Sequence, residues 1–162
     1  MISNILSLLL VFYCPFDKGE AENQVIKLID SAKTEIHGNA YGLTDPQFCD
    51  ALIRAKARGV DVIFTVDATQ AAGTYARPLI KKMKSSGIEV LVGKSPVKNQ
   101  LLHLKSFEVD KTYLEDGSWN YSPSASQQFN VVVIQESPER VNMFLEAWQQ
   151  IYNYLKTKAN TK

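Results

Sequence analysis

Short apolar runs alternate along the chain with longer segments in which apolar residues recur every three or four positions. Runs of the first kind are typical of buried strands, and segments of the second kind are typical of helices that cover a sheet. We expect strands at residues 10–13, 35–41, 60–66, 88–92, 101–109, 112–115 and 130–134. We expect helices at residues 21–33, 45–58, 75–84 and 138–155. The alternation predicts an α/β fold in which a mixed β-sheet is sandwiched by helices.

Capping residues mark the ends of two of these helices. Asp45 stands before Pro46, and an acidic N-cap followed by proline in the first turn is a typical helix start. Gly59 and Gly87 follow the second and third helices, where a glycine often ends a helix.

Length and composition indicate one compact domain over residues 1–162. The chain is 45% hydrophobic and 22% charged, a balance that allows a proper core to be buried. Cys14 and Cys49 are too few for a disulfide framework, so we expect two buried free thiols. Residues 156–162 are expected to form a frayed, solvated tail.

The amino terminus leaves two interpretations open. Residues 5–12 form an apolar run, but no Lys or Arg precedes it and no small-x-small cleavage site follows. The run is too short to span a bilayer. We favour a core strand, with residues 1–10 as either a leader or an extension of that strand. A cytoplasmic location is favoured accordingly, while export to the periplasm and membrane association stay open.

The net charge of +1 indicates no class of partner, but the charges are unevenly distributed. Between Arg54 and Lys105 there are ten basic residues against three acidic ones, a net charge of +7, and the rest of the chain carries −6. A basic segment of this kind is typical of a surface that binds the nucleic-acid backbone, although lysines on exposed helix faces also occur only to keep a protein soluble. The candidate track consists of Arg77, Lys81, Lys82, Lys84, Lys94 and Lys98.

One eighteen-residue stretch carries the candidate chemistry, with the spacing H-x-K-x4-D-x6-G-S-x-N. Its specified positions are His103, Lys105, Asp110, Gly117, Ser118 and Asn120. A histidine that titrates near neutrality can attack phosphorus as an imidazole or protonate a leaving oxygen as an imidazolium. Side chains two apart on a strand share a face, so we expect Lys105 to bring its charge to the phosphate that His103 attacks.

The remaining motif residues have distinct expected roles. Gly117 lets backbone come close to a ligand, and Ser118 and Asn120 can donate hydrogen bonds to phosphate oxygens. Asp110 stands at a turn between two expected strands, and we expect it to fix that turn rather than take part in catalysis. The predicted catalytic residues are therefore His103, Lys105 and Asn120.

The sequence predicts no metal site and no cofactor. The two histidines are far apart and no H-E-x-x-H motif is present. His37 has no chemical partners close to it in sequence, so we interpret it as a structural or surface residue.

The motif resembles that of the phospholipase D superfamily, and the short chain with one copy resembles its small bacterial endonucleases. This resemblance implies the phospholipase D-like fold and a metal-independent reaction through a phosphohistidine. Members build one site from two such motifs, so a chain with one motif implies a homodimer. His103 of one subunit would attack phosphorus, and His103 of the other would protonate the leaving oxygen.

The sequence departs from the family pattern at one place. In the short nucleases, a glutamate just ahead of an asparagine accepts a hydrogen bond from the catalytic imidazole; here Phe129 stands at that position. Gln128 is the candidate substitute as a neutral acceptor. A missing carboxylate would leave the imidazole tautomer less fixed and slow the reaction.

Three hypotheses about function follow. The first is a phosphodiesterase acting on nucleic acid, either DNA, including single-stranded DNA, or RNA. The second is a phospholipid phosphodiesterase of the phospholipase D or cardiolipin hydrolase type. The third is a nucleic-acid-binding relative with little or no activity, for which Phe129 is the sequence support.

Overall fold

A seven-stranded mixed sheet forms the centre of the computed structural model, which describes residues 8–160. The strands are β1 (Leu9–Cys14), β2 (Glu35–Ala40), β3 (Asp61–Asp67), β4 (Glu89–Gly93), β5 (Lys105–Val109), β6 (Tyr113–Gly117) and β7 (Asn130–Glu136). Their order across the sheet is β1-β7-β6-β5-β2-β3-β4. β2, β3 and β4 are parallel, and the other neighbours are antiparallel.

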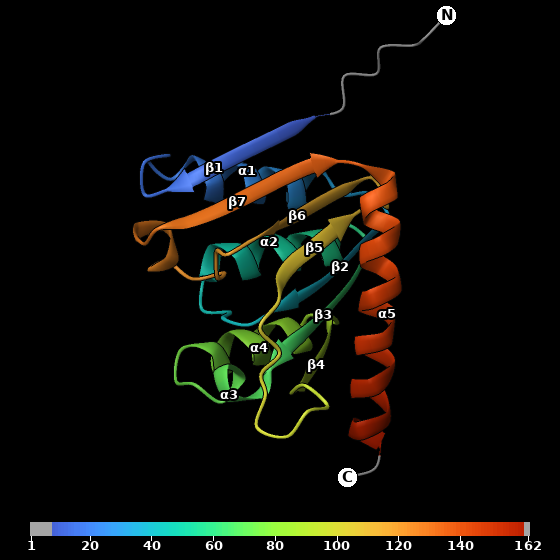
Figure 1. Cartoon of the computed structure of the whole chain (residues 1–162). Helices are drawn as coiled ribbons and strands as arrows, with labels where there is room; N and C mark the ends of the chain where they lie inside the picture. The colour runs from blue at the N-terminus through green and yellow to red at the C-terminus, as the bar shows by residue number, and fades with distance from the viewer. Residues whose placement is uncertain (1–7, 161–162) are drawn as a thin grey trace, which may run out of the picture.

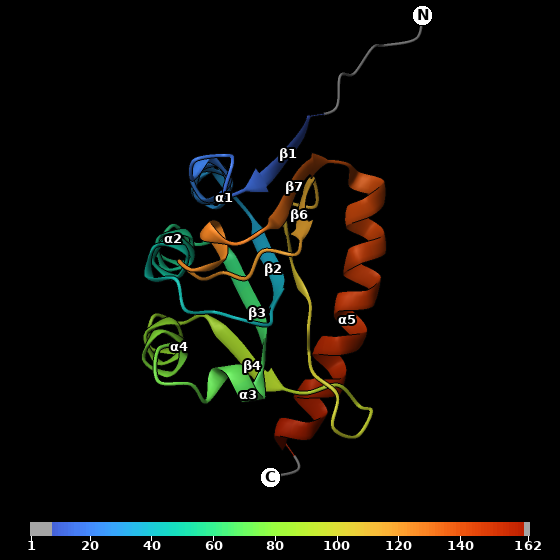
Figure 2. The ribbon, with the colours of Figure 1, turned by 60° about the vertical axis from the view of Figure 1, so that its left-hand side comes forward.

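Helices cover both faces of the sheet. The helices are α1 (Glu20–Ser31), α2 (Pro46–Ala57), α3 (Ala68–Ala71), α4 (Ala76–Ser85) and α5 (Pro138–Asn160), with a 3-10 turn η1 (Ala125–Gln127). Figures 1 and 2 show α1, α2 and α4 on one face and the long helix α5 alone on the other. The predicted α/β class with a mixed sheet between helices is confirmed. Among the described helices, none has the length and apolar character of a membrane span.

Aromatic side chains form the centre of the core under α2. Phe48 of α2 stacks on Tyr121 with ring centroids 4.1 Å apart, and Phe64 of β3 and Phe107 of β5 meet the same pair edge-on. All four side chains are buried. Tyr121 lies just after the G-S-x-N segment, so this packing ties the motif to the core.

The caps confirm the predicted helix ends. The Asp45 carboxylate accepts hydrogen bonds from the backbone N–H groups of Gln47 and Phe48, with Pro46 in the first turn. Gly59 and Gly87 have φ values of +93° and +84°, which favour glycine. Both cysteines are buried free thiols, as expected.

Three predictions of local structure were wrong. The strand expected at 101–109 begins only at Lys105, because backbone groups of residues 102 and 104 bond outside the sheet. The short helix α3 was not predicted. The expected frayed tail is helical up to Asn160, and residues 161–162 lie outside the described part. The two interpretations of residues 1–10, a leader or an extension of the first strand, concern residues that lie mostly outside the described part. The described part starts at residue 8, and β1 starts at Leu9.

Candidate active site

His103 and Lys105 lie against each other at the start of β5. Lys105 Nζ lies 3.3 Å from each ring nitrogen of His103 and donates a 2.8 Å hydrogen bond to the His103 carbonyl oxygen. The imidazole is exposed, whereas Lys105 is only 7% exposed. Burial lowers the pKa of Lys105 from its ordinary value. A partly desolvated ammonium attracts a phosphate more strongly than one surrounded by water.

Tyr41 supports both of these side chains. Its ring centroid lies 4.4 Å from that of the His103 imidazole and 4.8 Å from Lys105 Nζ. Gln70 donates a 3.1 Å hydrogen bond to the Tyr41 hydroxyl. Because Tyr41 directly follows β2, the sheet positions the aromatic face against which the pair rests.

Asp67 holds the segment in front of His103. This buried residue ends β3, and its Oδ2 accepts a 3.0 Å hydrogen bond from the Leu102 N–H. Its Oδ1 caps α3 by accepting from the N–H groups of Thr69 and Gln70. On the other side, the Tyr41 N–H donates to the Leu104 carbonyl at 2.8 Å. These bonds fix the non-strand conformation that presents the imidazole.

Gly117 is required by its surroundings. A Cβ atom at this position would lie 2.1 Å from the Val131 carbonyl oxygen, and its φ is +156°. This close approach lets the neighbouring Ser118 N–H donate to the same carbonyl at 3.0 Å. The Ser118 hydroxyl donates to Asn130 Oδ1 at 2.9 Å and accepts from the Val131 N–H at 3.0 Å. Ser118 is therefore already bonded to β7, and phosphate binding by its hydroxyl stays a prediction.

Asn120 lines the same cleft as His103 and lies next to Gly42. A Cβ atom at position 42 would come within 3.2 Å of the Asn120 side chain, so the glycine leaves room for it. Asn120 Oδ1 is buried and forms no hydrogen bond with the described residues. Unpaired buried polar atoms are rare and concentrate at functional sites.

A cleft of about 740 Å³ brings five motif residues together. They are His103, Lys105, Gly117, Ser118 and Asn120, and α5 contributes Arg140, Met143 and Phe144. The Arg140 guanidinium donates to Asp116 Oδ2 and Gln135 Oε1, both at 2.5 Å. The cleft therefore holds two cationic side chains, Lys105 and Arg140, next to an exposed imidazole.

A buried pair lies behind this cleft, on β6 and the segment that follows it. The Tyr121 hydroxyl donates a 2.9 Å hydrogen bond to Glu115 Oε2, and both side chains are fully buried. Burial raises the pKa of Glu115 well above its ordinary value, and the hydrogen bond from Tyr121 opposes that shift only in part. Burial also raises the pKa of Tyr121.

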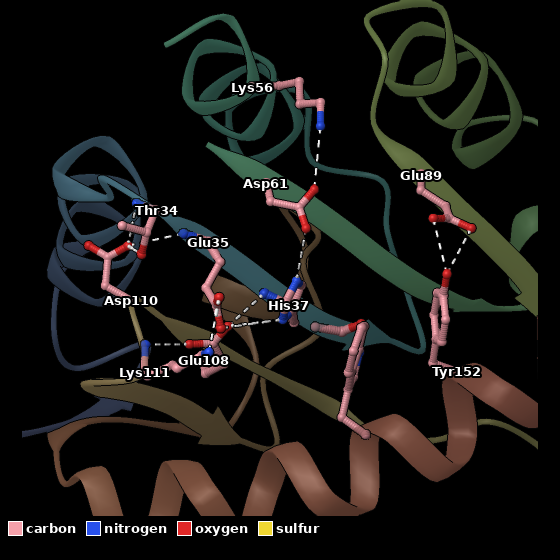
Figure 3. A network of polar contacts seen from close by, with 12 residues as sticks. Thr34, Glu35, His37, Lys56, Asp61, Glu89, Glu108, Asp110, Lys111 and Tyr152 are labelled. Atoms are coloured by element: carbon pink, nitrogen blue, oxygen red, sulfur yellow. Dashed lines mark hydrogen bonds and ion pairs between the residues drawn. The ribbon is translucent and has the colours of Figure 1, made fainter. Parts of the chain in front are cut away.

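Asp110 lies at the opposite end of β5 from Lys105, about 16 Å away at the usual rise per strand residue. Its carboxylate accepts hydrogen bonds from the N–H groups of Lys33, Thr34 and Glu35 and from the Thr34 hydroxyl. Burial raises its pKa, but these hydrogen bonds outweigh that effect and the pKa is lowered overall. Asp110 ties the β5–β6 turn to the start of β2 (Figure 3).

Phe129 and Gln128 are not brought to the imidazole within one chain. Phe129 is 83% exposed, and its ring contact is with Phe16, at 5.9 Å between centroids. Gln128 is an exposed residue at the end of η1. Among residues 8–160, Lys105 is the only side chain that forms a hydrogen bond with the His103 ring.

The residues of the predicted basic track do not lie together in the structure. Lys94 lines a hollow of about 400 Å³ together with His103. α4 runs from the His103 edge of the sheet back to the far edge, since β3 and β4 are parallel. Arg77 thus lies toward the edge where β3 ends and Lys84 toward the opposite edge, and neither lines the cleft, while Lys82 is paired with Asp50 at 2.6 Å. Lys81 lies between them on α4, and Lys98 lies in the loop before β5.

Sequence reasoning missed three residues of the site: Tyr41, Asp67 and Arg140. Asp67 had a detectable signal, because an aspartate between a strand and Ala68-Thr69 is a typical N-cap. Arg140 and Tyr41 had none, since only the packing of α5 and the pairing of β2 with β5 bring them to the motif.

The family model described as "Cardiolipin synthase, PLD-like domain" matches residues 25–155. The chain belongs to the phospholipase D superfamily. Proteins named phospholipase D from Rickettsia bellii and Rickettsia conorii are 31% and 30% identical to it over 122 residues. These matches cover 74% of this chain and 58% of each relative, so the chain spans less than two thirds of their length.

Two solved structures share the fold. The phospholipase D family member Nuc from Salmonella typhimurium has a TM-score of 0.83 and 33% identity, covering 91% of this chain and 95% of that chain. NucT from Helicobacter pylori has the same TM-score at 19% identity, covering 91% and 96%, a likeness of fold alone. The predicted phospholipase D-like fold is thereby confirmed.

Proposed function

We propose that this superfamily member is a metal-independent phosphodiesterase that hydrolyses nucleic acid, DNA or RNA, with His103 as nucleophile. The observation that carries the proposal is the His103–Lys105 contact at the mouth of a cleft that also holds Asn120. An exposed imidazole beside a fixed ammonium supplies both the attacking nitrogen and the positive charge that phosphoryl transfer requires.

The reaction divides into two displacements at phosphorus. A ring nitrogen of His103 forms a bond to phosphorus, the bond to the leaving oxygen breaks, and a second imidazole gives that oxygen its proton. That second group then takes a proton from water as the water oxygen displaces His103 from phosphorus. Lys105 and Asn120 hold the non-bridging oxygens throughout. No step requires a metal ion, because histidine supplies the nucleophile and lysine the charge.

The second imidazole belongs to another copy of the chain in this proposal. His37, the other histidine, lies three residues before Ala40, the β2 partner of Lys105, and so it is remote from the cleft. A C2 dimer that places two His103 residues face to face would complete the site. Analytical ultracentrifugation tests this: a dimer is expected, and a fully active monomer would contradict it.

Three observations support nucleic acid as the substrate. The likeness to Nuc extends over nearly the full length of both chains. Lys94 adds a positive charge near His103, and Lys105 adds another in the cleft. The exposed rings of Phe16 and Phe129 form a pair beside Ser118, where unstacked bases can pack on aromatic faces.

A phospholipid phosphodiesterase is the second candidate. The relatives in Rickettsia are named phospholipase D. Leu101 and Leu104, on either side of His103, are exposed apolar residues of the kind that could contact a lipid surface. A nucleic-acid-binding relative without turnover is the third candidate, supported by Phe129 in place of a carboxylate.

One experiment separates the three candidates. The pure protein is incubated in EDTA with single-stranded DNA, duplex DNA, RNA and phospholipid vesicles, and products are quantified. We expect cleavage of nucleic acid; faster lipid hydrolysis would favour the second candidate, and binding without products would favour the third.

Nucleic-acid affinity should fall with salt, and Lys94→Ala should reduce the slope of that dependence by about one unit. Lys84→Ala is the matched control, since Lys84 lies toward the opposite edge of the sheet.

A further inference from the structure

Glu35, His37 and Glu108 form a cluster on β2 and β5, and none of the three residues lines the cleft. Glu35 and His37 lie on β2, and His37 is the register partner of Glu108 on β5, so their side chains emerge on the same face (Figure 3). One ligand atom from each residue lies within 4.8 Å of the others. His37 lies three positions before Ala40, the register partner of Lys105, which is about 10 Å along β2. The cluster is therefore distinct from the proposed active site.

The orientation of the imidazole leaves one nitrogen without a partner. His37 Nε2 forms a 3.5 Å hydrogen bond with Asp61 Oδ2, whereas Nδ1 meets hydrogen-bond geometry with neither neighbouring carboxylate, so we assign the ring proton to Nε2. In the neutral ring, Nδ1 then presents a lone pair to Glu108 Oε1 at 3.4 Å and to Glu35 Oε1 at 3.8 Å. Nδ1 and Glu35 Oε1 are both buried and form no hydrogen bond with residues 8–160. Lys111 Nζ lies 3.6 Å from the other Glu35 oxygen, Oε2. Three electron-rich atoms, His37 Nδ1, Glu35 Oε1 and Glu108 Oε1, therefore face one another, an arrangement that a cation between them would stabilise.

The spacing of the three atoms suits a tetrahedral metal ion. Zinc binds nitrogen and oxygen ligands at about 2.0–2.2 Å, which places ligands of a tetrahedron about 3.3–3.6 Å apart. The two separations around Nδ1 are 3.4 and 3.8 Å, and all three ligand atoms lie within 4.8 Å of one another, so the carboxylates would move inward to reach one ion. Two carboxylates and one neutral imidazole balance the charge of a dication, and imidazole favours zinc-type ions over Mg²⁺ or Ca²⁺.

Neighbouring groups hold each ligand in place. Glu108 is fully buried, and its two oxygens accept hydrogen bonds from the N–H groups of His37 (3.2 Å) and Lys111 (2.9 Å). The indole of Trp148 on α5 stacks on the His37 ring at 4.5 Å and 10°. Asp61 accepts the hydrogen bond from Nε2, which is the role of the carboxylate in the carboxylate–histidine–zinc arrangement.

We propose that Glu35, His37 and Glu108 bind one zinc-type divalent cation, with Asp61 orienting His37. Such an ion would join β2, β5 and, through Trp148, α5. Its role is to stabilise the fold, and it takes no part in hydrolysis at His103. The proposal is independent of the proposed function, because it concerns different residues and is tested without substrate.

Calorimetric titration of the tag-free chain with Zn²⁺ after EDTA treatment and dialysis tests the site. We expect one ion per chain and a higher melting temperature with Zn²⁺ but not with Mg²⁺. His37→Gln and Glu35→Gln should each weaken binding at least a hundredfold, and Asp61→Asn by about tenfold. His103→Gln is the matched control and should bind as the wild type does.

A second measurement needs no variant. Two-bond ¹H–¹⁵N NMR spectra of the wild-type chain report the state of each imidazole nitrogen. On addition of Zn²⁺, the Nδ1 resonance of His37 should shift while both nitrogens of His103 stay unchanged. Zinc binding retained in His37→Gln but lost in His103→Gln would overturn the proposal. So would an unchanged melting temperature together with an unshifted His37, which would mean that a proton occupies the cluster.

Discussion

Lys105 Nζ lies 3.3 Å from both ring nitrogens of His103, and it does not single out either one. Its shortest bond, 2.8 Å, goes to the His103 carbonyl oxygen, so the backbone rather than the ring anchors the ammonium. The ring is thus free to turn one nitrogen toward phosphorus while the charge remains in place. The two residues therefore make separable contributions, which the first two predictions address.

His103→Ala should abolish hydrolysis and leave the fold intact. The ring is exposed, so its removal costs little burial. Activity on nucleic acid and the melting temperature are the measurements. Residual turnover within tenfold of the wild type would show that another group attacks phosphorus.

Lys105→Met should lower kcat/KM by about a hundred- to a thousandfold, equivalent to about 3–4 kcal/mol of transition-state stabilisation. Methionine keeps an unbranched apolar chain in this buried position, so the fold is preserved while the charge is lost. Steady-state kinetics check the result, with circular dichroism as the control for folding. A loss of less than fivefold would mean that Arg140 or another cation carries the phosphate charge.

Gly117→Ala should destabilise the chain by about 3 kcal/mol, because the new methyl group would overlap the Val131 carbonyl. Gly19→Ala is the matched control: it has a positive φ of +85° but no atom within 4 Å of a Cβ, so only about 1 kcal/mol is expected. Urea denaturation measures both. Equal losses would mean that backbone conformation, and not the contact with β7, makes Gly117 necessary.

Glu115→Gln should flatten the dependence of stability on pH. Burial raises the pKa of Glu115 in the folded chain. At a pH below the pKa of an unfolded glutamate, the carboxyl is protonated in both the folded and the unfolded state, so it does not change the free energy of unfolding. As pH rises above that value, the unfolded chain ionises while the folded chain keeps its proton, and stability falls. The wild type should lose up to about 1.4 kcal/mol per pH unit relative to the variant. Urea denaturation from pH 5 to 8 measures this difference; parallel curves would mean that Glu115 is ionised when folded.

Phe129→Glu should raise turnover and move the acidic limb of the pH–rate profile to higher pH, because a carboxylate near the imidazole favours its protonated form. The ring is 83% exposed, so the variant should fold. Phe129→Gln, neutral and of the same shape as glutamate, is the control. If both variants match the wild type, position 129 does not face an imidazole even in the dimer.

The sequence predicted those parts of the fold that depend on local patterns. Asp45 and Pro46 together form a local helix-start signal, and a nearly continuous apolar run such as that of β3 is typical of a buried strand. The motif was predictable for a similar reason, since His103, Lys105, Gly117, Ser118 and Asn120 lie within one short stretch. Their gathering around one cleft follows from the β5–β6 hairpin.

Features that depend on strand order were beyond the sequence. His37 and Glu108 are 71 residues apart and meet only because β2 lies beside β5. Arg140 reaches the cleft because α5 crosses the face of the sheet that the other helices leave uncovered (Figure 2). The boundary of β5 was misjudged because Asp67, on a different strand, accepts the Leu102 N–H.

Trapping of the covalent intermediate tests the central claim most directly. The protein is mixed with a nucleic-acid substrate in EDTA, quenched with alkali within the first turnover, digested and examined by mass spectrometry. Phosphohistidine is stable in alkali, so we predict a nucleotide joined to the peptide that contains His103 through a nitrogen–phosphorus bond, and no such adduct in His103→Ala. Rapid hydrolysis with no adduct, or with an adduct on any other residue, would contradict the account.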